Sequence, residues 1–122
     1  MASALEARLA ERDRLVALAG TYVEGLARRL SVMAAAVVGS VARGDFNVWS
    51  DVDVVVVSAE LPERGPDRGA VLGEDAPPSV QPVGFTPDEF ETAWRRRNPM
   101  VLEATSVGIA LAGEEYLRRP RA

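Results

Sequence analysis

The sequence predicts an α+β domain in which helices pack on a small β-sheet. Two short apolar runs, VMAAAVV (32–38) and VDVVVV (52–57), have the composition of strands, while other segments carry apolar residues at helical spacing. These signals mix along 122 residues without an internal repeat, and that length suits one domain over residues 1–122. Apolar residues make up 48% of the chain, which allows a substantial core and argues against disorder.

Residues 3–30 predict a long N-terminal helix. Ser3 is a suitable N-cap, and Glu6 completes a capping box three residues later. Packing on the sheet explains the apolar face best, and a contact with a second copy of the chain (a homodimer) or with another partner is the alternative. The stripe is interrupted at Arg12; it comprises Leu5, Leu9, Val16, Ala19, Val23, Leu26 and Leu30, and Leu15, Leu18 and Tyr22 widen it.

The two strand candidates follow this helix. The first, 32–38, ends at Gly39 and Ser40, after which a short helical turn fits. The second, 52–57, carries β-branched residues at nearly every position. Such a run indicates burial on both faces of a sheet.

Residues 60–79 are rich in Pro and Gly and predict a surface loop with a helical turn at 68–73. The segment VQPVGF (80–85) predicts a third strand. Pro82 has no N–H to donate to a neighbouring strand, so this strand is expected at an edge of the sheet or with a bulge.

A helix is expected to begin after the third strand. Thr86 is its N-cap, Pro87 occupies the first helical position, and Glu89 lies three residues beyond the cap. This helix covers TPDEFETAWRRR (86–97) and is broken by Asn98-Pro99; a shorter helix at 99–107 and a last strand or extended segment at 108–113 follow.

Composition excludes several classes of function. The chain has no cysteine and no histidine, so disulfides, thiolate chemistry, imidazole-based triads and histidine zinc sites are unavailable. The net charge of −4 argues against a broad nucleic-acid surface. All fourteen basic residues are arginines, and the clusters at 94–97 and 117–122 are interpreted as solvated helix faces. No signal peptide or membrane span is evident, and a cytoplasmic protein without a membrane partner is expected.

Asp51 and Asp53 lie at the start of the second strand. Alternate side chains of a strand point to the same face, and the Cα atoms of two such residues lie ~7 Å apart, since the rise is roughly 3.3 Å per residue. The pair can converge on one or two divalent cations, and two such ions about 3.5–4 Å apart form the usual clamp for phosphoryl displacement. Without a cation the carboxylates repel, and one tends to take up a proton.

Gly39 and Ser40 supply the complementary chemistry. Exposed backbone N–H groups after a strand can hold a phosphate, the Ser40 hydroxyl can donate to it, and Gly39 leaves room for close approach. If the two strands are neighbours, anion-binding amides lie beside cation-binding carboxylates, as a nucleoside triphosphate with magnesium requires.

The stretch GSVARGDFNVWSDVDVVVV (39–57) resembles the signature of the nucleotidyltransferase superfamily related to DNA polymerase beta. It is most similar to the minimal, stand-alone nucleotidyltransferases of bacteria and archaea, and the segment 86–113 resembles their C-terminal helices and last strand. The residues that match the family pattern are Gly39, Ser40, Ala42, Arg43, Gly44, Ser50, Asp51 and Asp53.

The resemblance implies a nucleotidyltransferase fold with a mixed sheet, and transfer of a nucleoside monophosphate from a triphosphate, with ATP favoured, to a protein or small-molecule acceptor. It implies that Asp51 and Asp53 hold two Mg²⁺ ions and act in catalysis. It also implies that Gly39 and Ser40 bind the nucleotide. Arg43 lies near the phosphates or, equally, forms a surface pair with Asp45, and Ser50 belongs to the nucleotide site as the residue that orders the turn before the strand.

One position departs from the family pattern. The family usually carries a third carboxylate on the next strand, and the matching residue here is Gln81. An amide cannot accept a proton from a hydroxyl and is a poor magnesium ligand. Glu74, Asp75 and Glu103 are candidate substitutes, and Gln81 as a simple solvated residue is the other interpretation.

Three hypotheses follow. The first is a magnesium-dependent transferase, which the resemblance connects with antitoxins that adenylylate a small helical partner, the HEPN-type toxin. The second is a catalytically weak nucleotide-binding or partner-binding module that acts by contact. The third, antibiotic nucleotidylation, is less favoured because those enzymes usually carry an extra domain.

Overall fold

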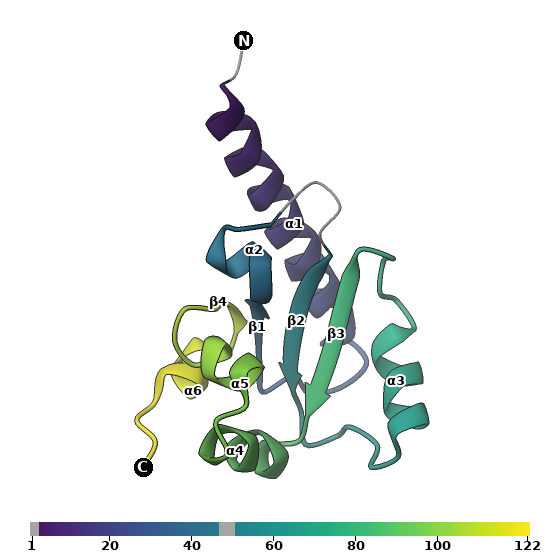
Figure 1. Ribbon diagram of the computed structural model, residues 1–122. Helices are drawn as coiled ribbons and strands as arrows, with labels where there is room; N and C mark the ends of the chain where they lie inside the picture. The colour runs from purple at the N-terminus through teal and green to yellow at the C-terminus, as the bar shows by residue number, and fades with distance from the viewer. Residues whose placement is uncertain (1–2, 47–50) are drawn as a thin grey trace.

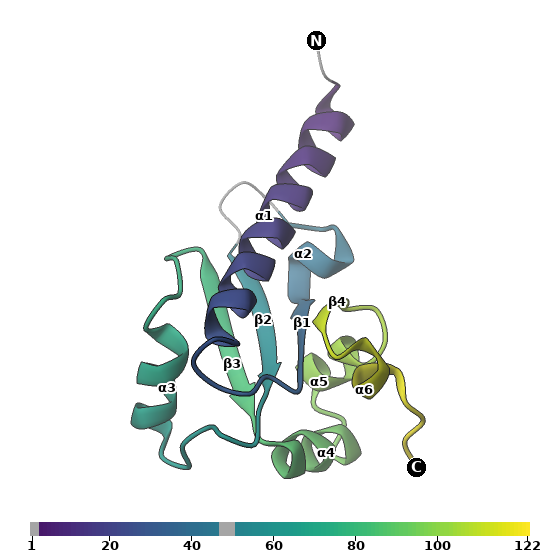
Figure 2. The same ribbon diagram turned by 180° about the vertical axis from the view of Figure 1, so that it is seen from behind.

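The computed structural model describes residues 3–46 and 51–122, in which a four-stranded sheet lies between two groups of helices (Figures 1 and 2). The strand order is β3-β2-β1-β4. β1 pairs antiparallel with both β2 and β4, and β2 pairs parallel with β3, so the sheet is mixed as expected. The strands are β1 (Ala34–Val38), β2 (Val52–Val57), β3 (Val80–Phe85) and β4 (Ile109–Ala112).

Helices precede, follow and separate these strands. They are α1 (Ala4–Leu26), α2 (Gly39–Arg43), α3 (Gly65–Gly73), α4 (Pro87–Arg95), α5 (Pro99–Ala104) and α6 (Glu114–Arg118). The helical turn expected after Gly39 is α2. Two differences from the sequence prediction stand out: α3 is a nine-residue helix that extends the helical turn expected at 68–73, and α6 was not expected.

The long helix α1 crosses the face of the sheet that is turned toward the viewer in Figure 2. Ser3 caps it as predicted, accepting a hydrogen bond from the Glu6 N–H at 3.1 Å. Its C-terminal half is buried against the sheet, and the helix ends at Leu26, four residues earlier than predicted. Its first turns extend beyond the sheet, so Leu5 and Leu9 are 66% and 50% exposed. Only part of the apolar stripe therefore belongs to the core.

Arg12, which interrupts the stripe, connects α1 to α2. Its Nε donates to the Val41 carbonyl and its Nη2 to the Ala42 carbonyl, both at 2.9 Å. These carbonyls lie in the last turn of α2, where an α-helix has no partners of its own for its C=O groups. One turn earlier on α1, Arg8 donates to the carbonyls of Gly44 and Phe46. The two arginines thus fix α2 to the long helix.

The opposite face of the sheet is covered by α4, α5 and α6, whose anchors Phe90, Val101 and Leu117 are fully buried. β2 alternates between the two cores, with Val54 and Val56 facing α1 and Val55 and Val57 facing α4–α6. The predicted burial of β2 on both faces is confirmed.

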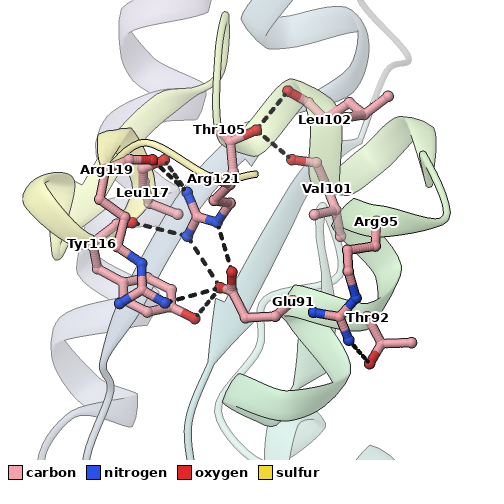
Figure 3. Close-up of polar contacts among 10 residues, drawn as sticks. All are labelled: Glu91, Thr92, Arg95, Val101, Leu102, Thr105, Tyr116, Leu117, Arg119 and Arg121. Carbon is pink, nitrogen blue, oxygen red and sulfur yellow. Dashed lines mark hydrogen bonds and ion pairs between the residues drawn. The ribbon is translucent and has the colours of Figure 1, made fainter.

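Of the C-terminal arginines, Arg118 and Arg119 are exposed as expected, but Arg121 is not (Figure 3). Arg121 is 5% exposed in its side chain and forms an ion pair with Glu91 at 2.9 Å. Its guanidinium also donates to the Tyr116 and Leu117 carbonyls and lies over the rings of Phe90 and Tyr116. The cluster fastens the end of the chain to α4.

β3 is an edge strand that pairs only with β2 among the described residues, as Pro82 suggested. Thr86 and Glu89 form the predicted capping box at the start of α4, with both reciprocal hydrogen bonds present. In the described part of the chain, no helix is long and apolar enough to cross a bilayer.

Candidate functional site

The end of β1 and the start of β2 meet at one end of the two central strands of the sheet. Antiparallel pairing places Val38 directly opposite Asp53, so Gly39 and α2 begin beside this aspartate. The contact is close: a Cβ placed on Gly39 would lie 2.6 Å from Asp53 Oδ2. Gly39 also has φ +74°, which side chains rarely adopt. Both the space and the backbone conformation therefore require glycine at this position.

Asp53 lies on β2 and is partly buried, while Asp51 directly precedes the strand and is exposed. The pKa of Asp53 is raised, first by burial and then by the negative charges of Asp51 and Glu103, while Arg43 acts in the opposite direction. Negative charge thus accumulates around Asp53, and a cation bound there would relieve the repulsion.

Gly39 and Arg43 contact a carboxylate that comes from α5. The Gly39 N–H donates to Glu103 Oε2 at 3.0 Å, and Arg43 Nη1 donates to Glu103 Oε1 at 2.9 Å. Arg43 Nε also lies 3.3 Å from Asp45 Oδ2, so the surface pair considered for this arginine is present beside the contact with Glu103. Ser40 follows in the first turn of α2 and is partly exposed. Ser50 lies outside the described residues.

Gln81 lies on β3 directly opposite Asp53 of β2. Residues opposite each other on parallel strands share a face of the sheet, so Gln81 stands beside Asp53. Its side chain is exposed, and its Nε2 donates to the Pro78 carbonyl at 3.2 Å.

The three candidate substitutes for the missing carboxylate differ in position. Glu74 and Asp75 form ion pairs with Arg29, which follows α1, at 2.8 and 3.0 Å. Glu103 alone reaches the site, through its contacts with Gly39 and Arg43. Sequence reasoning named Glu103 without selecting it, because about sixty residues separate it from both partners.

The donor set fits magnesium that arrives with a nucleotide. Among residues 3–46 and 51–122, no group of three acidic side chains is gathered so as to hold a metal ion. Magnesium is commonly bound by only one or two carboxylates together with substrate phosphates and water. Asp51 and Asp53 beside the Gly39 N–H match this second mode, with carboxylates for the cation and donors for the phosphate.

Comparisons with known proteins identify the family and support the fold. The family profile described as a nucleotidyltransferase domain matches residues 20–98, which include β1, α2, β2 and β3. A crystal structure from Sulfolobus solfataricus, assigned as a nucleotidyltransferase, superposes with a TM-score of 0.63 over 70% of this chain and 78% of the other. Its sequence is 24% identical, so it supports the fold alone. No curated protein matches the sequence. Because the profile spans more than half of the chain, the protein belongs to the nucleotidyltransferase domain family.

Proposed function

We propose that the protein is a magnesium-dependent transferase that moves a nucleoside monophosphate from a nucleoside triphosphate to an acceptor and releases pyrophosphate. The observation that carries this proposal is the contact between Gly39 and Asp53, which joins a phosphate-binding turn to a carboxylate pair. Neither feature alone is specific, but a magnesium–triphosphate complex needs both within a few ångströms of each other.

Each side chain has a defined part in this proposal. Asp51 and Asp53 hold two Mg²⁺ ions, which supply charge stabilisation for the displaced phosphoryl oxygens. The Gly39 N–H, the Ser40 hydroxyl and the Arg43 guanidinium bind the triphosphate. Gln81 cannot accept the proton of the attacking hydroxyl, so the natural protein is expected to be a slow transferase.

A second candidate is a module of the same fold that acts by contact with a partner. Two observations favour it: Gln81 stands in place of a carboxylate, and Leu5 and Leu9 are exposed on the protruding turns of α1. A helical HEPN-type toxin is the partner to test first, because minimal nucleotidyltransferases are expected to pair with such proteins. Under this reading nucleotide binding persists while transfer is weak.

Calorimetric titration with ATP, GTP, CTP and UTP, each with and without Mg²⁺, tests the nucleotide site. At least one nucleotide is expected to bind, and only with the metal. Asp51→Asn should abolish that dependence, whereas Glu24→Gln, which removes a charge from the exposed surface of α1, should leave it unchanged. Absence of binding to all four nucleotides at millimolar concentration would contradict the proposal.

A further inference from the structure

Glu103 makes contacts that its own helix does not require. It belongs to α5, whose start is capped by Asn98 and whose residues Val101 and Ala104 are buried against the sheet. Its side chain, 23% exposed, leaves the helix and lies against the start of α2. The packing of α5 therefore fixes the backbone position of Glu103, and the donors on α2 determine where its carboxylate group lies.

The two oxygens of this carboxylate meet two different donors. Oε2 accepts the Gly39 N–H at 3.0 Å, and Oε1 accepts Arg43 Nη1 at 2.9 Å. A backbone amide and a guanidinium arranged around one anion are also the donors that bind a phosphate group. A nucleotide phosphate at the proposed site needs these same two donors.

We infer that Glu103 is a further residue of the nucleotide site, an internal carboxylate that occupies the Gly39 amide and the Arg43 guanidinium and that the incoming triphosphate displaces. The inference rests on the proposed function, because it assigns these two donors to the nucleotide. Glu103 thereby sets the affinity for the triphosphate and keeps the two donors in place while the nucleotide is absent.

The geometry favours displacement over a role as the missing third metal ligand. Both oxygens of Glu103 face groups that donate hydrogen bonds, and no group of three acidic side chains in the described segments is gathered to hold a metal ion. Gln81 lies beside Asp53 on β3, which is on one side of β2. β1, which leads into Gly39, lies on the other side of β2. Glu103 thus approaches the site from the side where the phosphates are expected.

Removing the charge of Glu103 should strengthen phosphate binding. When a ligand can bind only the fraction of molecules with a free site, its apparent dissociation constant is raised by the inverse of that fraction. If about 10–30% of the natural protein has Glu103 displaced, Glu103→Gln and Glu103→Ala should bind about three- to tenfold more tightly. Glu103→Gln keeps the shape of the side chain, and melting curves of both variants check that they are folded.

The experiment is a titration of the purified chain with inorganic tripolyphosphate and with the four nucleoside triphosphates, in Mg²⁺ and in EDTA. Glu24→Gln is the control, since it makes the same change of net charge on α1. Tighter binding by both Glu103 variants, with the control unchanged, supports the inference.

The remaining outcomes overturn it. Unchanged binding in the Glu103 variants would show that the carboxylate does not compete, while the proposed function would stand. Weaker binding only in Mg²⁺ would make Glu103 a metal ligand instead. Absence of binding in the natural protein and in every variant would remove the proposed function and this inference together.

Discussion

Asp53 and Gln81 lie directly opposite each other on the parallel strands β2 and β3. The pKa of Asp53 is raised, because burial and the charges of Asp51 and Glu103 disfavour its ionised form, whereas Gln81 cannot ionise. Gln81 thus places an uncharged amide next to an aspartate whose ionised form is only partly offset by Arg43. Under the proposed function, this pair would bind a metal–nucleotide complex with Asp53 and lack a base at Gln81.

Gln81→Glu should increase transfer. It restores an ionised oxygen beside Asp53 that can hold metal and accept the proton of the attacking hydroxyl, and general-base catalysis contributes on the order of 10²–10⁴ in rate. Pyrophosphate release with Mg²⁺ and with Mn²⁺ measures the change. Val83→Glu is the matched control, because it adds the same charge two residues further along the same face, opposite Val55. A natural protein that is already fast and that Gln81→Glu slows would show that the third position has been misplaced.

Asp53→Asn should weaken magnesium-dependent nucleotide binding by at least about 10–100-fold, the cost of losing even an outer partner of a metal site. Without metal, its melting temperature at neutral pH should equal or exceed that of the natural protein. The folded pKa of Asp53 is raised, so its ionised form destabilises the fold at neutral pH, and that penalty disappears as the pH falls below the ordinary pKa of an aspartate. The difference between the two melting curves should therefore vanish in acid. A large loss of stability at neutral pH would instead mark Asp53 as a structural residue.

Gly39→Ala and Gly44→Ala form a matched pair. Both glycines have positive φ, +74° and +85°, so each alanine should cost about 1–2 kcal/mol through the backbone. A Cβ at Gly44 meets no atom within 4 Å, whereas one at Gly39 meets Asp53 Oδ2 at 2.6 Å. Nucleotide binding should thus survive Gly44→Ala and fail in Gly39→Ala. Chemical denaturation and nucleotide titration measure the two effects, and equal binding by both variants would contradict the close approach of Gly39 to Asp53.

Glu91→Gln tests the cluster that anchors the C-terminus (Figure 3). Burial alone would raise the pKa of Glu91, but hydrogen bonds from Arg121 and Tyr116 and the charges of Arg121 and Arg119 hold it below its ordinary value. A lowered pKa contributes stability that is present above the unfolded value and is lost as pH falls through the folded value. The variant should therefore lose about 1–3 kcal/mol at neutral pH and match the natural protein in strong acid.

Glu11→Gln, which breaks an exposed pair with Arg14, is the control for this cluster and should change stability little. Urea denaturation across pH measures both variants. An equally small effect of Glu91→Gln at neutral pH would show that the pairing of Arg121 with Glu91 does not stabilise the fold.

The strands were the most predictable part of the fold, and their pairing was not. Val52–Val57 could be read from the sequence because a run of β-branched residues has few alternatives. Which residue lies opposite Asp53 depends on how β2 and β3 associate across an intervening helix, and local propensity does not determine that register. Only the second part of α3, at 68–73, was expected, because Gly65 and Pro66 favour a loop by propensity. Its buried Leu72, whose carbonyl accepts a hydrogen bond from the Tyr22 hydroxyl, holds the helix in place.

The residues of the site also differ in how well the sequence predicted them. Gly39, Asp51 and Asp53 lie within fifteen residues, so their spacing alone indicated a shared function. Glu103 joins them only through the packing of α5, and the burial of Arg121 was hidden because charged residues are usually solvated. Long-range contacts of charged side chains are where this sequence was least informative.

The central claim, nucleotidyl transfer at Asp51 and Asp53, is tested most directly by the fate of the phosphates. The protein is incubated with Mg²⁺ and soluble cell extract, with ATP labelled at either the α- or the γ-phosphate, and the same is done with Asp53→Asn. Label from the α-phosphate should appear on an acceptor, or on the protein itself, only with the natural protein and with release of pyrophosphate. Transfer of the γ-label, or α-labelling that persists in Asp53→Asn, would contradict the account.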